Sequence, residues 1–298
     1  MNGTMNAVEL FAGAGGLGMG ISLAGFKPIA VVEWDRWACD TIRENAERGY
    51  PLVKNWPLLE TDVRSLDLRP FRENIHLVAG GPPCQPFSMG GKHRAQLDDR
   101  DMFPATVEVM RKLRPKAFII ENVRGLMRTA FTNYFQYIIL QMTFPEVRRR
   151  GNECEAAHFA RLEREKTSSR RRGLTYQVIP RVLNAADFGV PQKRERVFIV
   201  GFRADLGIEW SFDEIGQSHS FDALLTDQWV TGEYWERHAV AEKHRPPRPE
   251  RLTKRIEKLC QLNLRPDDSY KPWRTVRDAL DGIPDPRESE GCEGFLNH

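Results

Sequence analysis

Cys84 lies in a loop that can hold a thiol ready for chemistry. It belongs to the segment Pro82-Pro83-Cys84-Gln85-Pro86-Phe87-Ser88, which follows an apolar run that ends in Gly80-Gly81. Prolines and glycines at these positions fix the backbone and disfavour a helix. A strand that ends here would place Cys84 at the carboxyl edge of a sheet, where a thiol is a candidate nucleophile. The alternative is a buried cysteine that only fills space.

A glycine-rich loop follows the first predicted strand. It contains the spacing Gly13-x-Gly15-x-x-Gly18, and Glu33 lies twenty positions after Gly13 at the end of the next strand. Glycines let a cofactor approach the backbone, and a carboxylate at this distance can accept from both ribose hydroxyls. The pattern alone fits a nicotinamide cofactor as well as S-adenosyl-L-methionine. Trp34, which can stack on adenine, and Asp62, which can accept from its exocyclic amine, favour S-adenosyl-L-methionine.

Strand and helix patterns alternate from residue 7 to about residue 202, which predicts an α/β fold with a doubly wound, mostly parallel sheet. We expect strands at 8–11, 28–33, 77–80, 117–121, 176–183 and 197–202, and one more strand that ends near Val63. We expect helices at 17–24, 37–47 and 103–113. The charged segment 148–172 is expected to be a solvated excursion, with phosphate contact as the alternative.

Composition excludes several classes of protein. The 298 residues carry a net charge of +3, which suits a polyanionic partner. No apolar run approaches the roughly 18 residues of a membrane span, and the N-terminus lacks a signal sequence, so we expect a cytoplasmic protein. We expect free thiols and no metal site, because the five cysteines are irregularly spaced: Cys39, Cys84, Cys154, Cys260 and Cys292.

Four motifs in sequence order resemble those of the cytosine-C5 DNA methyltransferase family. Residues 11–16 resemble its cofactor motif, Pro82-Pro83-Cys84-Gln85 its catalytic motif, Glu121-Asn122-Val123 a third active-site motif and Gln192-Lys193-Arg194-Glu195-Arg196 its arginine motif. The resemblance covers residues 8–201. It implies a Rossmann-like, S-adenosyl-L-methionine-dependent methyltransferase that acts on double-stranded DNA in a bacterial restriction-modification system.

The chemistry of the residues agrees with this resemblance. Carbon 5 of cytosine is a poor nucleophile, so the Cys84 thiolate must first add to carbon 6. Glu121 can then donate to N3 of the ring; the alternative is a strand-end carboxylate that is only paired with an arginine. The resemblance favours Arg196 as a contact to the base, with Arg194 and Gln192 in support. Because the target carbon is inaccessible inside a duplex, the cytosine must be flipped out.

The resemblance and the spacing together give a full set of candidate site residues. Segment 87–102 is expected to close over the DNA strand around a hinge at Gly90-Gly91, with an ordinary polar surface loop as the alternative. The predicted contacts to nucleic acid are Gln85, Ser88, Lys92, Arg94 and Gln192. The predicted contacts to the cofactor are Phe11, Ala12, Gly13, Gly15, Gly16, Leu17, Glu33, Trp34, Asp62, Val63, Gly80 and Pro82.

The last third of the chain is harder to interpret. We expect a catalytic domain at 1–205 and an incomplete C-terminal extension at 206–298. Members of the resembled family continue into a target-recognition region, and its motifs are not found here. We therefore expect a second polypeptide that supplies them, docked on the part that carries Trp229, Trp235 and Trp273; a truncated member is the alternative. The sequence also leaves open a tRNA cytosine methyltransferase, a non-catalytic regulator and a nicotinamide oxidoreductase.

Overall fold

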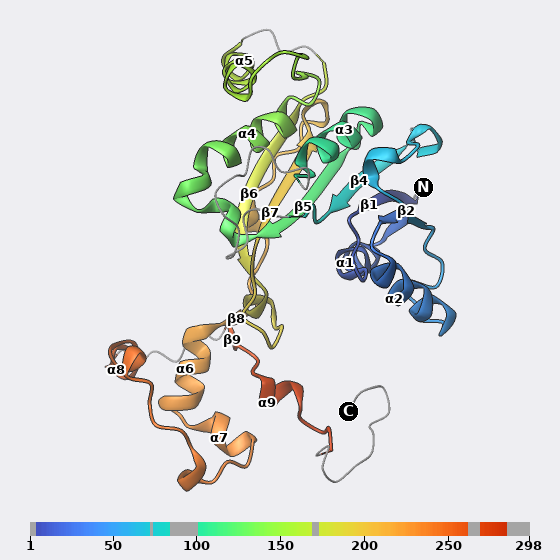
Figure 1. The fold of residues 1–298 in the computed structure, drawn as a ribbon. Helices are drawn as coiled ribbons and strands as arrows, with labels where there is room; N and C mark the ends of the chain where they lie inside the picture. The colour runs from blue at the N-terminus through green and yellow to red at the C-terminus, as the bar shows by residue number, and fades with distance from the viewer. Residues whose placement is uncertain (1–3, 72–73, 84–100, 169–172, 262–268, 285–298) are drawn as a thin grey trace. The chain divides into compact units, whose positions relative to one another are not determined.

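The computed structural model describes residues 4–71, 74–83, 101–168, 173–261 and 269–284. The chain forms two compact units (Figure 1). The first contains residues 1–182 and 196–212, and the second contains residues 183–195 and 213–298. The functional division predicted at residues 205 and 206 stays a prediction.

A seven-stranded sheet organises the first unit, and its order is β3-β2-β1-β4-β5-β7-β6. Neighbouring strands from β3 to β5 run parallel, whereas β7 runs antiparallel to β5. The mostly parallel α/β sheet predicted from the alternating pattern is thus confirmed. The strands are β1 (Met5–Leu10), β2 (Phe26–Glu33), β3 (Leu58–Glu60), β4 (Ile75–Gly80), β5 (Ala117–Val123), β6 (Tyr176–Asn184) and β7 (Glu195–Arg203).

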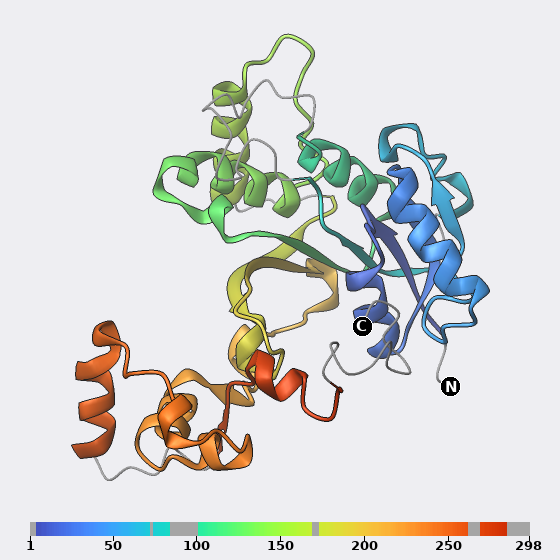
Figure 2. The same cartoon turned by 60° about the horizontal axis from the view of Figure 1, so that its bottom comes forward.

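Helices cover both faces of this sheet (Figures 1 and 2). Successive side chains of a strand point to opposite faces, so Ala7 of β1 packs in one cluster with Ile21 of α1, while Val8 and Leu10 pack in another with residues of α3 and α4. The helices are α1 (Gly16–Leu23), α2 (Arg36–Glu47), α3 (Phe103–Leu113), α4 (Thr132–Thr143) and α5 (Glu155–Thr167).

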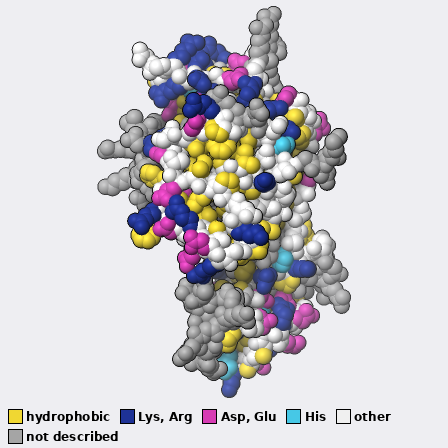
Figure 3. All heavy atoms as spheres, turned by 90° about the vertical axis from the view of Figure 1, so that its right-hand side faces the viewer, with side chains coloured by type: hydrophobic (Ala, Val, Ile, Leu, Met, Phe, Trp, Pro, Cys, Tyr) yellow, Lys and Arg dark blue, Asp and Glu magenta, His cyan; other side chains and the backbone are white. Residues whose placement is uncertain are grey.

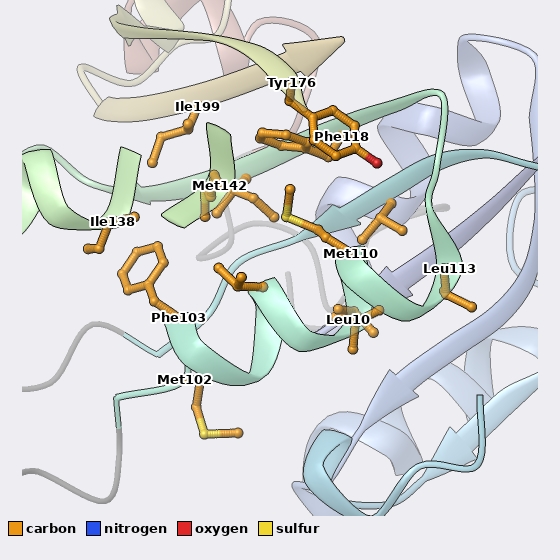
Figure 4. Close-up of a cluster of buried hydrophobic side chains, with 14 of the residues drawn as sticks. Leu10, Met102, Phe103, Met110, Leu113, Phe118, Ile138, Met142, Tyr176 and Ile199 are labelled. Carbon is orange, nitrogen blue, oxygen red and sulfur yellow. The ribbon is translucent and has the colours of Figure 1, made fainter. Parts of the chain in front are cut away.

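The larger core lies between the sheet and α3 and α4 (Figure 4). Phe118 of β5 meets Tyr176 of β6 edge to face, with ring centroids 5.2 Å apart. Phe118 also pairs in register with Gly201 of β7, where a side chain would overlap the phenyl ring. This packing fixes β5 and β7 side by side, and both strands carry candidate site residues.

The charged segment at 148–172 contains a helix, α5. Its buried His158 and Leu162 face inward, and His158 Nδ1 lies 2.8 Å from the hydroxyl of Tyr137 on α4. The excursion predicted from charge is therefore anchored by a few side chains on one face.

The second unit contains short elements around its own small core. Trp235 is buried, and Trp229 and Trp273 pack beside it with Leu224 and Tyr234. The three tryptophans thus pack in one cluster, and the partner predicted to dock on this part of the chain stays a prediction. No helix among the described residues is long and apolar enough to span a membrane. The elements are β8 (His219–Ser220), α6 (Phe221–Trp229), α7 (Glu233–Arg237), α8 (Thr253–Gln261), β9 (Lys271–Pro272) and α9 (Val276–Ala279).

Candidate active site

The strand order reverses between β1 and β4, and the candidate site residues gather there. From β1 the chain proceeds outward through β2 and β3, and it then returns to place β4 and β5 on the other side of β1. The loops that leave β1 and β4 therefore diverge, which opens a crevice at the carboxyl ends of the strands. The loop after β1 is the glycine-rich segment, and the loop after β4 leads through Pro82 and Pro83 toward Cys84.

A cavity of about 290 Å³ opens at this edge of the sheet. Most of its surface is apolar, which suits a planar aromatic ring, and Glu33 is a buried acceptor in its wall. Five of its lining residues were predicted from the sequence: Phe11, Glu33, Trp34, Asp62 and Val63. Five others were not: Val32, Thr61, Arg64, Pro83 and Met102.

The glycine loop is tightly folded against the cavity. Phe11 adopts a left-handed backbone conformation with φ of 54°, which is unusual for an aromatic residue and costs free energy. Gly15 has φ of 90°, and its amide donates to the carbonyl of Ala12. The ring of Trp56 covers Gly15 so closely that a side chain there would overlap it. Of this loop, Phe11 lines the cavity, while Gly15 is covered by Trp56.

Glu33 holds this loop from the end of β2. Its Oε2 accepts from the amide of Gly13 at 2.8 Å, and its Oε1 accepts from the amides of Trp34 and Asp35 at 2.8 Å each. A carboxylate has about four acceptor positions, so three are filled by the protein's own backbone. Oε2 retains capacity for one ligand hydroxyl, whereas the sequence suggested acceptance from two.

Asp62 and Trp34 flank the cavity in different ways. Asp62 accepts from both the backbone and the guanidinium of Arg64, and the side-chain hydrogen bonds lower the pKa of the carboxyl. Its oxygens are thus already engaged by a cation. The indole of Trp34 is 67% exposed, so one ring face is open to a ligand.

Hydrophobic side chains gather on the face of the molecule around α1 and α2, between groups of charged side chains (Figure 3). The exposed apolar residues in this part of the chain include Leu23, Trp34 and Trp37.

The loop after β4 is held by a buried amide. Asn122 is 2% exposed, and its Nδ2 donates to the carbonyl of Pro82 at 3.1 Å. Its Oδ1 accepts from the amide of Val123 at 2.8 Å. Gly80 pairs with Leu10 so closely that a side chain would overlap the Leu10 carbonyl. These contacts fix the residues that precede Cys84.

Glu121 and Arg196 form an ion pair at the same edge. Arg196 Nε lies 2.8 Å from Glu121 Oε1, and about a quarter of each side chain is exposed. The two residues belong to the antiparallel pair β5 and β7, in which Arg196 is opposite Val123. Glu121 Oε2 also lies against Gly81. The structure thus brings Glu121 and Arg196 to the loop that leads to Cys84.

Other predicted site residues lie elsewhere. Gln192 and Arg194 are exposed residues of the second unit, and the amide of Arg194 donates to the side chain of Asn184. Cys84, Gln85, Ser88, Lys92 and Arg94 lie outside the described residues. Asn122 was part of a quoted motif but was not assigned a role; its place directly after Glu121 was the available signal.

Comparisons with known proteins agree on one family. The model of the C-5 cytosine-specific DNA methylase family matches residues 5–144 and 162–271. Type II methyltransferase M.AquIA of Picosynechococcus sp. is 36% identical over 228 residues, which cover 74% of this chain and 80% of that protein. Type II methyltransferase M.Eco47II of Escherichia coli is 32% identical over 285 residues, which cover 94% of this chain and 56% of that protein.

A solved structure is also similar, the Dnmt2 methyltransferase of S. pombe, with a TM-score of 0.46 and 20% sequence identity. The match covers 72% of this chain and 54% of that one.

Proposed function

This chain belongs to the C-5 cytosine-specific DNA methylase family, and we propose that it transfers a methyl group from S-adenosyl-L-methionine to carbon 5 of a cytosine in DNA. The observation that supports this most directly is the ion pair of Glu121 and Arg196 beside the Asn122-held loop that leads to Cys84. We propose that this acid and cation act with the thiol of Cys84 beside the cavity, whose wall includes Pro83 of the same loop.

The cavity fits the cofactor that the family implies. When bound, S-adenosyl-L-methionine supplies a methyl group activated by a positively charged sulfur. The apolar walls formed by Phe11, Val63 and Met102 suit the adenine, and the open face of Trp34 can stack on it. Oε2 of Glu33 can accept from a ribose hydroxyl. We propose that the loop from Phe11 to Leu17, which includes Ala12 and Gly16, supports the rest of the molecule together with Gly80 and Pro82.

We propose that Cys84 starts the reaction. Its thiolate adds to carbon 6 of the cytosine, which forms a sulfur–carbon bond and moves an electron pair toward carbon 5 and N3. Glu121 donates a hydrogen bond or proton to N3, and Arg196 orients Glu121 while its charge stabilises the electron density that develops on the ring. After carbon 5 has gained the methyl group, a base, for which ordered water is the candidate, takes the proton from carbon 5. The electron pair of that carbon–hydrogen bond re-forms the ring double bond as the sulfur–carbon bond breaks, which restores the aromatic ring and the thiolate.

The nucleic-acid contacts form a second part of the proposal. The cytosine must leave the duplex to reach this edge of the sheet. We propose that Gln85, Ser88, Lys92 and Arg94 contact the flipped nucleotide or its strand, and that Gln192 with Arg194 contacts the DNA from the second unit.

The test is transfer of a labelled methyl group from S-adenosyl-L-methionine to bacterial DNA. We expect label in 5-methylcytosine with the wild-type chain and loss of transfer with Cys84→Ser, which keeps the size of the side chain but not its nucleophilicity. Adding the product of the neighbouring reading frame tests the predicted second polypeptide, which should raise transfer. Label in tRNA but not in DNA would contradict the proposal and favour a tRNA methyltransferase.

A further inference from the structure

Glu9 carries a carboxyl group that is fully buried in the centre of the sheet. Its exposed fraction is 0%, and neither oxygen forms a hydrogen bond of ordinary geometry with the described residues. Its backbone is held on both sides, because β1 pairs Glu9 with Val31 of β2 and with Ala79 of β4. Burying a polar group without a partner costs free energy. A carboxyl group at this position therefore requires an explanation.

The carboxyl of Glu9 lies directly against α1. A Cβ atom on Gly18 would overlap both Oε2 of Glu9 and the ring of Trp56. Gly18 belongs to the first turn of α1, and its amide faces the carboxyl. Trp56 also covers Gly15, and its own indole Nε1 is buried without a partner among the described residues. Glu9 thus supports the turn into which the glycine loop leads.

The contact between Glu9 and α1 depends on whether the carboxyl group of Glu9 is ionised. Burial raises the pKa of Glu9 to about 8, and the facing amide of Gly18 only partly offsets this rise. The negative charge of Glu33 on β2 raises the pKa further. α1 contains no titratable side chain and Trp56 has none, so neither neighbour compensates a carboxylate here. The raised pKa favours the uncharged acid at neutral pH.

We propose that Glu9 is a positioning residue for the cofactor site: its neutral carboxyl lets the first turn of α1 pack against β1, and its ionisation loosens that turn and weakens cofactor binding. Glu33 holds the loop at Gly13 by a hydrogen bond, and Glu9 packs against Gly18 where the loop enters the helix. The inference rests on the proposed function, because it takes S-adenosyl-L-methionine as the ligand of the loop.

The experiment measures the dissociation constant for S-adenosyl-L-methionine by calorimetry, with the full chain, across neutral and alkaline pH. In the wild type, we expect the dissociation constant to rise about tenfold per pH unit above the Glu9 pKa, since binding requires the neutral acid. Glu9→Gln cannot ionise at this position and should lack this rise, keeping only the pH dependence that comes from the ligand. Glu44→Gln, which changes an exposed carboxylate on α2, should behave as the wild type. The ligand's own amino group titrates equally with all three proteins, so the difference isolates Glu9.

Thermal unfolding of the same proteins gives a readout that needs no ligand. The pKa of Glu9 is raised from the ordinary 4.5 to about 8, so the unfolded state loses its proton first. Wild-type stability should therefore fall as the pH rises through that window. The stability of Glu9→Gln should lack this decrease with rising pH.

The outcomes separate the two proposals. Equal pH profiles of affinity for the wild type and Glu9→Gln would overturn the role of Glu9, and so would wild-type affinity that rises with pH. Absence of binding by the wild type at neutral pH would instead overturn the proposed function, and the positioning role with it. If Glu9→Gln fails to fold, infrared spectra of the wild type decide: a protonated carboxyl band that disappears as the pH rises through the Glu9 pKa supports the role, and its absence overturns it.

Discussion

At the scale of single residues, Asn122 connects the strand that carries Glu121 to the loop that leads to Cys84. Asn122→Ala removes the bond to the Pro82 carbonyl and leaves two buried backbone groups unpaired, which we expect to cost about 1–3 kcal/mol of stability. Misplacement of the loop should lower the methyl-transfer rate roughly 10- to 100-fold. The cofactor dissociation constant should change less than the rate, because Asn122 does not itself line the cavity and acts on its wall only through the segment Pro82-Pro83.

Asn122→Asp is the matched control for this prediction. It keeps the acceptor for the Val123 amide and loses only the donor to Pro82. We expect a rate as low as that of Asn122→Ala. A wild-type rate for Asn122→Asp would show that the bond to Pro82 has no part in placing the loop.

Glu33 was proposed from its spacing, and Glu121 and Arg196 from the family resemblance; their roles stay predictions, while the structure places Glu33 in the cavity wall and pairs Glu121 with Arg196. They did not predict how the side chains share their partners. Glu33 already accepts from three amides, and Asp62 is engaged by Arg64. Glu9 was missed because a charged residue in an alternating strand normally faces solvent. Its burial depends on α1, which covers this side chain by tertiary packing against the sheet.

At the scale of elements, α5 shows how one buried ring anchors a charged segment. His158 is 1% exposed; Tyr137 contacts its Nδ1, and its Nε2 lies 2.7 Å from the Val147 carbonyl. Burial lowers the pKa of His158 below the ordinary 6.5. The unfolded chain therefore binds a proton first as the pH falls. The stability that neutral His158 contributes is fully present above about pH 6.5 and is lost as the pH falls toward the folded-state pKa.

We expect the melting temperature of the wild type to decrease from about pH 6.5 downward, and His158→Gln to lack this component. Glu153, whose pKa is lowered to about 2 by hydrogen bonds from Arg161 and a backbone amide, affects stability only at more acidic pH. One series of thermal scans at different pH values separates the pH range in which His158 changes stability from the more acidic range in which Glu153 does. Parallel curves for the wild type and His158→Gln between pH 5 and 6.5 would contradict the assignment.

The bounds of regular elements followed well from local pattern. The helix predicted at 103–113 is α3 (Phe103–Leu113), and the strand predicted at 28–33 is the last part of β2. The segment at 148–172 was expected to be a surface helix and loop, and it contains α5. Its charge hid the two inward positions, His158 and Leu162, because a periodic signal of two residues is too weak to show which side of a helix packs.

At the scale of the whole molecule, the cavity lies within the first unit and the tryptophan cluster within the second. Trp235→Ala should destabilise the second unit by about 3–5 kcal/mol, because it empties a buried site. Cofactor affinity should be retained.

Trp34→Ala, at a position 67% exposed, should give the opposite pair of results, with weaker cofactor binding and nearly unchanged stability. Thermal unfolding and calorimetry on both variants test this, and loss of cofactor affinity in Trp235→Ala would show that the units depend on each other.

The composition of these units could not be predicted from local sequence. Residues 183–195 belong to the second unit because contacts far along the chain hold them there: the Ser218 amide donates to the Asp187 carbonyl, and the Trp273 indole donates to the Asp187 side chain. A partner was expected at the tryptophans because tryptophan is a common interface anchor; their packing in one cluster depends on residues far apart in the chain.

The backbone of Phe11 sets a limit on how this protein can be engineered. A left-handed aromatic residue at the cavity wall costs about 1–3 kcal/mol. A glycine there would relieve that cost and remove the ring that lines the cavity. Directed evolution for heat resistance alone would therefore favour a chain that melts later and binds its cofactor less well. A screen for a hardier enzyme should select for ligand binding and thermal tolerance together.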